Sequence, residues 1–124
     1  MARILVVEDN LSNMKLFSLI LDSMGHQVIE AFDAQTGLGL AQEQLPDLIL
    51  MDIQLPDMDG LEATRLLKRN MMTQGIKVVA LTAFAMKGDE ERMLAAGCDD
   101  YIAKPIRHAE FVEQISGILQ GNGS

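Results

Sequence analysis

Asp47-Leu-Ile-Leu-Met-Asp52 is an apolar run that ends on a carboxylate. It follows Leu45-Pro46 and precedes Leu55-Pro56, so residues typical of turns bound it on both sides. A continuous apolar run of this length is typical of a strand buried on both faces, as the central strands of parallel sheets are. In open α/β sheets the binding crevice lies outside the carboxyl ends of the strands. Asp52 is therefore expected at the mouth of such a crevice.

Apolar segments alternate with amphipathic ones on either side of this run. The patterns predict further strands over 3–7, 27–31, 76–81 and 101–103, and helices over 11–24, 34–44, 86–96 and 108–119, with one more helix starting at Gly60. Strict alternation with short connections indicates a parallel sheet covered by helices on both faces. Five units are too few for an eight-fold barrel, so we expect a flavodoxin-like (βα)5 doubly wound open parallel sheet with strand order 2-1-3-4-5.

Composition limits the class of protein. A chain of 124 residues is one domain, which we expect over 1–120, and residues 121–124 have the composition of a disordered tail. The net charge is -8 and Lys and Arg do not cluster, which argues against nucleic acid as a partner. Cys98 is a single cysteine and cannot form an internal disulfide. We expect a cytoplasmic protein, since no apolar run approaches the ~20 residues of a membrane helix and the N-terminus leads straight into a strand.

Carboxylates follow two strands that the predicted order makes neighbours. Glu8 and Asp9 follow the strand over 3–7, and Asp52 ends the opening run. Their side chains should converge at the point where the strand order reverses. Three adjacent carboxylates repel one another unless a cation offsets their charge, and an all-oxygen cluster favours a hard metal ion. The sequence therefore predicts a Mg²⁺ site, which would bind phosphate oxygens as well.

The other two strands end in residues suited to phosphate. Thr82 ends the strand over 76–81 and can donate a hydrogen bond to a phosphoryl oxygen, and Lys104 follows the strand over 101–103 with a compact positive charge. In this setting Asp52 can act as a nucleophile and form an acyl phosphate. Each residue taken singly has an ordinary structural explanation as a turn former, helix cap or surface lysine. Their convergence at one edge favours the functional interpretation.

Four segments of the chain resemble signatures of the receiver domains of two-component response regulators. The resemblance covers residues 2 to about 120, is CheY-like, and is most similar to single-domain DivK-type and phosphorelay receivers. It rests on Val6-Val-Glu-Asp-Asn10, Leu48-Ile-Leu-Met-Asp-Ile-Gln-Leu-Pro56, Leu81-Thr-Ala-Phe-Ala-Met86 and Tyr101-Ile-Ala-Lys-Pro105.

The resemblance implies a role for each matched residue. Asp52 would be the phosphoacceptor, and Glu8, Asp9, Asp52 and the backbone carbonyl of Gln54 would hold Mg²⁺. Lys104 would bind the phosphoryl group.

Two further features are implied by the resemblance. Thr82 and Tyr101 match the pair that rearranges on phosphorylation, and the Lys104-Pro105 peptide bond would be cis.

The family also implies a histidine kinase or histidine phosphotransfer protein as phosphodonor, which would dock near the start of the first helix. The downstream protein target would bind the face formed by 86–96, 101–103 and 108–119. Such a protein is a phosphoacceptor switch that catalyses its own phosphorylation and dephosphorylation, rather than an enzyme in the usual sense.

Two other functions fit the same fold. A Mg²⁺-dependent phosphohydrolase with an Asp nucleophile would normally place a general acid two residues after it, and Gln54 occupies that position. A flavodoxin-like cofactor binder would need aromatic side chains to stack on a ring, and the chain has four Phe, one Tyr and no Trp.

Overall fold

The computed structural model describes residues 1–83 and 87–121. Strands and helices alternate as predicted: β1 (Arg3–Val7), α1 (Leu11–Ser23), β2 (Gln27–Ala31), α2 (Ala34–Gln44), β3 (Leu48–Asp52), α3 (Gly60–Arg69), β4 (Lys77–Thr82), α4 (Lys87–Ala96), β5 (Asp100–Ala103) and α5 (His108–Gly121). Met86, the expected first residue of the fourth helix, and residues 122–124 of the expected tail lie outside the described residues. Gly121, expected as the first residue of that tail, is the last residue of α5.

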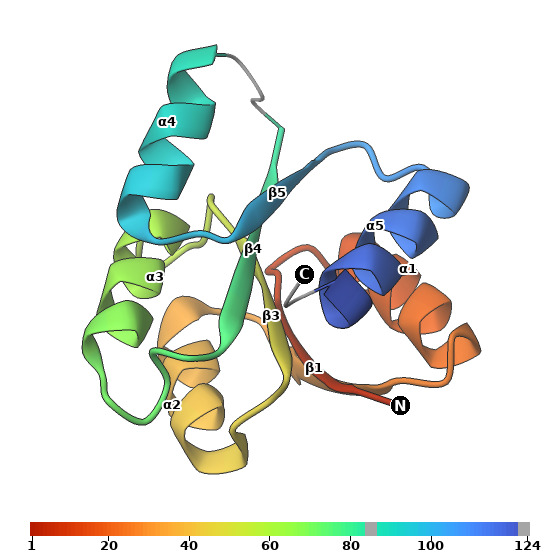
Figure 1. Cartoon of the computed structure of the whole chain (residues 1–124), viewed down its shortest axis with the longest axis horizontal. Helices are drawn as coiled ribbons and strands as arrows, with labels where there is room; N and C mark the ends of the chain where they lie inside the picture. The colour runs from red at the N-terminus through yellow and green to blue at the C-terminus, as the bar shows by residue number, and fades with distance from the viewer. Residues whose placement is uncertain (84–86, 122–124) are drawn as a thin grey trace.

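The five strands form one parallel sheet in the order β2-β1-β3-β4-β5, which confirms the predicted topology. Figure 1 shows α1 and α5 on one face of the sheet and α2, α3 and α4 on the other. Val7 pairs with Met51, and Asp52 pairs with Leu81, so the carboxyl ends of the central strands lie side by side. The end of β3 is thus flanked by the ends of β1 and β4.

The apolar run in β3 is buried over its whole length because helices cover both faces of the sheet. Leu48 and Leu50 belong to the core under α1 and α5, where Phe17 and Phe111 pack with their ring centroids 5.6 Å apart. The alternate residues of β3 belong to the core under α2 and α3. A strand whose successive side chains enter two cores has no polar face, which is the pattern seen in the sequence.

The ends of the first two helices are formed by residues that favour those positions, with one exception. Asn10 and Asp33 are the N-caps of α1 and α2, and each side chain accepts a hydrogen bond from the backbone N–H three residues later. Gly25, which follows α1, has φ 88°. Leu45 ends α2 in the left-handed region at φ 45°, a conformation that favours glycine and that the sequence did not indicate.

Gly60 allows α3 to begin directly against the end of β3. Its backbone N–H donates to the carbonyl oxygen of Ile53 over 2.8 Å. A Cβ atom at this position would overlap the carbonyl oxygen of Asp52. Glycine is therefore required here by close approach of two backbone segments. Among the described helices, none has the length and apolar character needed to cross a membrane.

Candidate functional site

Three carboxylates meet at the carboxyl ends of β1 and β3. Glu8 and Asp9 directly follow β1, and Asp52 is the last residue of β3. One carboxylate oxygen from each lies within 4.8 Å of the others. Glu8 is 1% exposed and Asp52 4%, whereas Asp9 is exposed to solvent. The structure thus brings together the three acids that the sequence placed at one edge, with two of them buried.

Lys104 extends from the end of β5 to these acids. Its Nζ lies 2.9 Å from Glu8 Oε1 and 3.1 Å from Asp52 Oδ2. Its backbone N–H donates to the carbonyl oxygen of Thr82 over 2.7 Å, and the peptide bond to Pro105 is cis, as the resemblance implied. Burial lowers the pKa of Lys104, but the two carboxylates have the larger combined effect and raise it overall. Lys104 is therefore a fixed positive charge at this edge of the sheet.

Glu8 has one carboxylate oxygen without a hydrogen bond among the described residues. Oε2 accepts from the Asn10 backbone N–H over 3.1 Å, while Oε1 contacts Lys104 as an ion pair that lacks hydrogen-bond geometry. Burial raises the pKa of Glu8, and the Lys104 ammonium group only partly offsets this effect. Asp52 raises the pKa of Glu8 further. The acidic cluster therefore holds more negative charge than Lys104 balances.

The donor set fits Mg²⁺. A buried oxygen without a hydrogen bond, close to two further carboxylates, is the arrangement that a hard divalent cation satisfies. The Gln54 backbone N–H donates to Asp52 Oδ1 over 3.1 Å, which fixes the rotation of the Asp52 carboxylate. Gln54 also forms an isolated antiparallel bridge with Asp59, so the backbone that would offer the Gln54 carbonyl belongs to a closed loop.

Thr82 and Tyr101 lie on neighbouring strands, at different distances from the acids along the sheet. Thr82 is the last residue of β4, is 3% exposed, and pairs with Ala103 directly before Lys104. Tyr101 pairs with Ala80, one register step after the start of β5, and its half-buried side chain packs on the cluster under α4. The pKa of Tyr101 is raised mainly by the negative charge of Glu90 on α4. Thr82 thus borders the acidic cluster, whereas Tyr101 belongs to the α4 side.

One residue near the site has a role that the sequence did not indicate. Asp57 lies between β3 and α3, and its carboxylate accepts hydrogen bonds from the first two backbone N–H groups of α2. Pro56-Asp57 reads as an ordinary turn, and the partners of Asp57 lie more than twenty residues earlier in the chain. A pattern confined to neighbouring residues therefore carries no signal for this contact.

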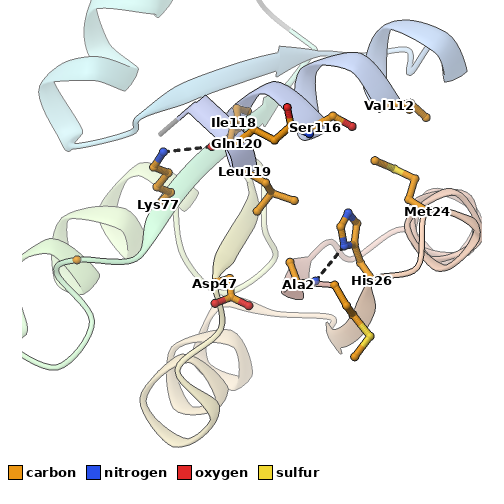
Figure 2. Close-up of a pocket in the computed structure, with 12 residues that line it drawn as sticks. Ala2, Met24, His26, Asp47, Lys77, Val112, Ser116, Ile118, Leu119 and Gln120 are labelled. Carbon is orange, nitrogen blue, oxygen red and sulfur yellow. Dashed lines mark hydrogen bonds between the residues drawn. The ribbon is translucent and has the colours of Figure 1, made fainter. Parts of the chain in front are cut away.

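A cavity of about 820 Å³ lies at the opposite edge of the sheet, where β1, β3 and β4 begin. Figure 2 shows it between α5 and the end of α1, with His26 Nδ1 accepting from the Ala2 backbone N–H over 3.1 Å. On the α5 side, Lys77 Nζ donates to the carbonyl oxygen of Ile118 over 3.1 Å. Its lining includes none of the predicted site residues. The predicted site residues thus lie at the acidic edge of the sheet, at the opposite ends of the strands from this cavity.

Comparison with known proteins agrees with this site. The profile described as the response regulator receiver domain matches residues 4–116. The polar-differentiation response regulator DivK of Brucella anthropi is 49% identical over 116 residues, which cover 94% of each chain.

Solved structures give the same result. The receiver domain of a sensor histidine kinase from Pseudomonas aeruginosa, which has a magnesium ion coordinated in its active site cleft, is 38% identical with a TM-score of 0.86, over 97% of this chain and 98% of that one. A CheY-like receiver domain protein from Methanospirillum hungatei is 31% identical with a TM-score of 0.89, over 98% and 95%. The chain therefore belongs to the response regulator receiver domain family of two-component signalling.

Proposed function

We propose that Asp52 accepts a phosphoryl group from a phosphohistidine and that this modification switches the binding of partner proteins. One observation carries the proposal: Asp52 is buried at the end of β3, with Lys104 Nζ 3.1 Å away and two further carboxylates beside it. Asp52 shares this lysine with Glu8, so the contacts of Lys104 give two buried carboxylates one positive charge between them. The arrangement suits a carboxylate that reacts and a cation that arrives with the phosphoryl group.

The transfer requires little covalent chemistry from the protein. A carboxylate oxygen of Asp52 attacks the phosphorus atom, the P–O bond forms, and the P–N bond to the donor imidazole breaks with its electron pair leaving on nitrogen. Lys104 Nζ, already within contact distance of Asp52, neutralises charge on the phosphoryl oxygens. The Gln54 backbone N–H holds the carboxylate in one rotation for the attack. Attack by water on the same phosphorus would later release phosphate and restore Asp52, so the protein would catalyse its own dephosphorylation.

We propose that Glu8, Asp9, Asp52 and the backbone carbonyl of Gln54 hold Mg²⁺. The support is the grouping of the three carboxylates and the buried Glu8 oxygen without a hydrogen bond. When bound, the metal ion supplies positive charge to the phosphoryl oxygens during transfer. Removal of the metal with a chelator should therefore abolish phosphorylation without unfolding the protein, since Lys104 still pairs with the buried Glu8 and Asp52 carboxylates.

We propose that the signal passes from Thr82 to Tyr101 and then to the face formed by α4, β5 and α5. In this proposal the Thr82 hydroxyl donates a hydrogen bond to a phosphoryl oxygen at Asp52, and the movement of Thr82 frees space for the Tyr101 ring. Tyr101 packs between the sheet and α4, and its carbonyl oxygen accepts a hydrogen bond from Gln114 of α5 over 3.0 Å. It therefore contacts each element of the proposed face. Tyr101→Ala should therefore remove the effect of phosphorylation on the affinity for a downstream protein.

The proposed phosphodonor is a histidine kinase or a histidine phosphotransfer protein. It would approach the exposed Asp9 and the start of α1, where Leu11 is 60% exposed beside the acidic cluster. An apolar side chain at this position gives a donor protein a contact next to the reacting carboxylate. We place the protein in the cytoplasm, where histidine kinases present their phosphohistidine.

Intact-mass spectrometry tests the proposal. The protein is incubated with a small acyl-phosphate donor and Mg²⁺, and the wild type, Asp52→Asn and Asp47→Asn are compared. Asp47 is a matched control because it flanks the opposite end of the same strand, where it accepts a hydrogen bond from the Arg3 backbone N–H over 2.8 Å. We expect a base-labile phosphoryl adduct on the wild type and on Asp47→Asn, but none on Asp52→Asn. A wild type without an adduct, or an adduct that survives in Asp52→Asn, would contradict the proposal.

A further inference from the structure

Asp57 joins two segments that border the acidic cluster. Its Oδ1 accepts from the Ala34 backbone N–H over 2.8 Å, and its Oδ2 accepts from the Gln35 backbone N–H over 2.9 Å. Asp57 lies in the loop of residues 53–59 between β3 and α3, whereas its two partners begin α2. Both carboxylate oxygens are thus used to attach the loop to a helix that is distant in the sequence. The same two bonds lower the pKa of Asp57, so it carries its full charge at neutral pH.

The loop is closed at its base and held at its far side by Asp57. At the base, Gly60 N–H donates to the Ile53 carbonyl over 2.8 Å, and Gln54 bridges to Asp59. At the far side, the Asp57 carboxylate and the partly buried Leu55 and Met58 contact the α2 side of the molecule. The base includes the backbone of Gln54, which donates to Asp52. Because Gln54 and Asp57 belong to the same short loop, movement of the far side of the loop would shift the position of the Gln54 backbone.

On the α2 side, Asp57 attaches close to the segment that carries Glu8. The backbone N–H of Glu8 donates to the carbonyl oxygen of Ala31 over 3.0 Å, and Ala31 lies three residues before Ala34. The helix has its own cap, because Asp33 accepts from the Thr36 backbone N–H over 2.7 Å. Asp57 is therefore not needed as the side-chain N-cap of α2. Its bonds set the position of the 53–59 loop relative to the segment that ends β2 and supports Glu8.

We infer that Asp57 is a positioning residue for the metal site, one that holds the backbone of Gln54 in place relative to Glu8. The inference rests on the proposed function, in which both residues supply ligands to one Mg²⁺. Without the Asp57 bonds the loop has more freedom, and binding the cation must then order it. Ligands that are already in place bind a metal ion more tightly than ligands that must be ordered first.

Calorimetric titration with Mg²⁺ alone tests the inference without any phosphodonor. Asp57→Ala removes both acceptor oxygens, and Asp57→Asn keeps one of them in a side chain of the same shape. Asp33→Ala is the matched control, since it removes a hydrogen bond from the same end of α2 but leaves the loop attached. Thermal unfolding of each variant reports the loss of stability separately.

We expect Asp57→Ala to raise the Mg²⁺ dissociation constant by about tenfold, the lower end of the range for partners that orient metal ligands. Asp57→Asn should give a smaller increase, and Asp33→Ala should lower the unfolding temperature with the dissociation constant unchanged. If Asp57→Ala and Asp57→Asn both bound Mg²⁺ with the wild-type affinity, the inference about Asp57 would be overturned, and the proposed metal site would stand. A wild type that binds no Mg²⁺ would overturn both the inference and the proposed metal site.

Discussion

Replacement of Lys104 by methionine should destabilise the protein and make its stability depend strongly on Mg²⁺. Methionine keeps the length of the side chain and removes its charge. The Lys104 side chain is 18% exposed and contacts Glu8 at 2.9 Å and Asp52 at 3.1 Å. Without it, two buried carboxylates would face each other with no positive charge from these contacts.

The size of the effect follows from the contact distances. At about 3 Å and an effective dielectric constant near 20, each ion pair is worth roughly 5 kcal/mol before the cost of desolvation is counted. Removal of one partner of a buried ion pair typically costs about 3–5 kcal/mol, because the remaining charge stays buried. Lys104 is partly exposed, so we expect Lys104→Met to lower the free energy of unfolding by about 3 kcal/mol at pH 7. Saturating Mg²⁺ should reduce this loss, since the cation supplies the missing charge.

Urea unfolding with and without Mg²⁺ measures both effects. Lys77→Met is the matched control, because Lys77 Nζ donates to the carbonyl oxygen of Ile118 at the opposite edge of the sheet. Loss of that single bond should cost about 1 kcal/mol, whether or not Mg²⁺ is present. The reasoning would be refuted if Lys104→Met lost no more stability than Lys77→Met. It would also be refuted if Mg²⁺ stabilised Lys104→Met no more than it stabilised the wild type.

Two further predictions concern the support of the site and its proposed output. Gly60→Ala should lower the free energy of unfolding by about 1–3 kcal/mol, because the added methyl group overlaps the backbone carbonyl of Asp52. Gly39→Ala is the control, because Gly39 lies in the middle of α2 and nothing lies within 4 Å of the new Cβ. This variant should instead stabilise the protein by about 0.5–1 kcal/mol. Equal effects in the two variants would contradict the packing argument. Glu90→Gln should lower the pKa of Tyr101 toward its ordinary value, because the Glu90 charge is the main cause of the raised pKa. The chain has one tyrosine and no tryptophan, so ultraviolet titration reads this pKa directly. An unchanged pKa would show that the Glu90 charge is not what raises the pKa of Tyr101.

The fold could be predicted from the sequence because its signals are local. The apolar run of β3 reports burial on both faces, and alternation with amphipathic segments reports a parallel sheet. The left-handed conformation of Leu45 could not be predicted, since nothing in that side chain favours it. Leu45 adopts this conformation because the chain must end α2 and turn back toward β3. That path is set by the assembled fold and not by the local sequence.

Much of the site could be predicted for a geometric reason. In a parallel sheet the residues that follow each strand meet at one edge, so Glu8, Asp9, Asp52 and Lys104 could be placed together before any distance was known. Asp57 could not be predicted, because its partners on α2 are fixed by the path of a loop and not by strand order.

Tyr101 illustrates a different limit. Its proposed role came from the family resemblance, since strand order alone places it one pairing step away from the acidic edge, beside Ala80. Periodicity also gave no sign of its interaction with Glu90, which joins two elements whose relative position depends on the packing of α4.

Chemical identification of the phosphorylated residue tests the central claim most directly. Borohydride reduces an aspartyl phosphate to homoserine, so the product marks the modified position in a peptide digest. After incubation with an acyl-phosphate donor and Mg²⁺, we predict homoserine at position 52 and unchanged aspartate at position 9, the residue of the acidic cluster that is exposed to solvent. Homoserine at position 9, or none at position 52, would contradict the account.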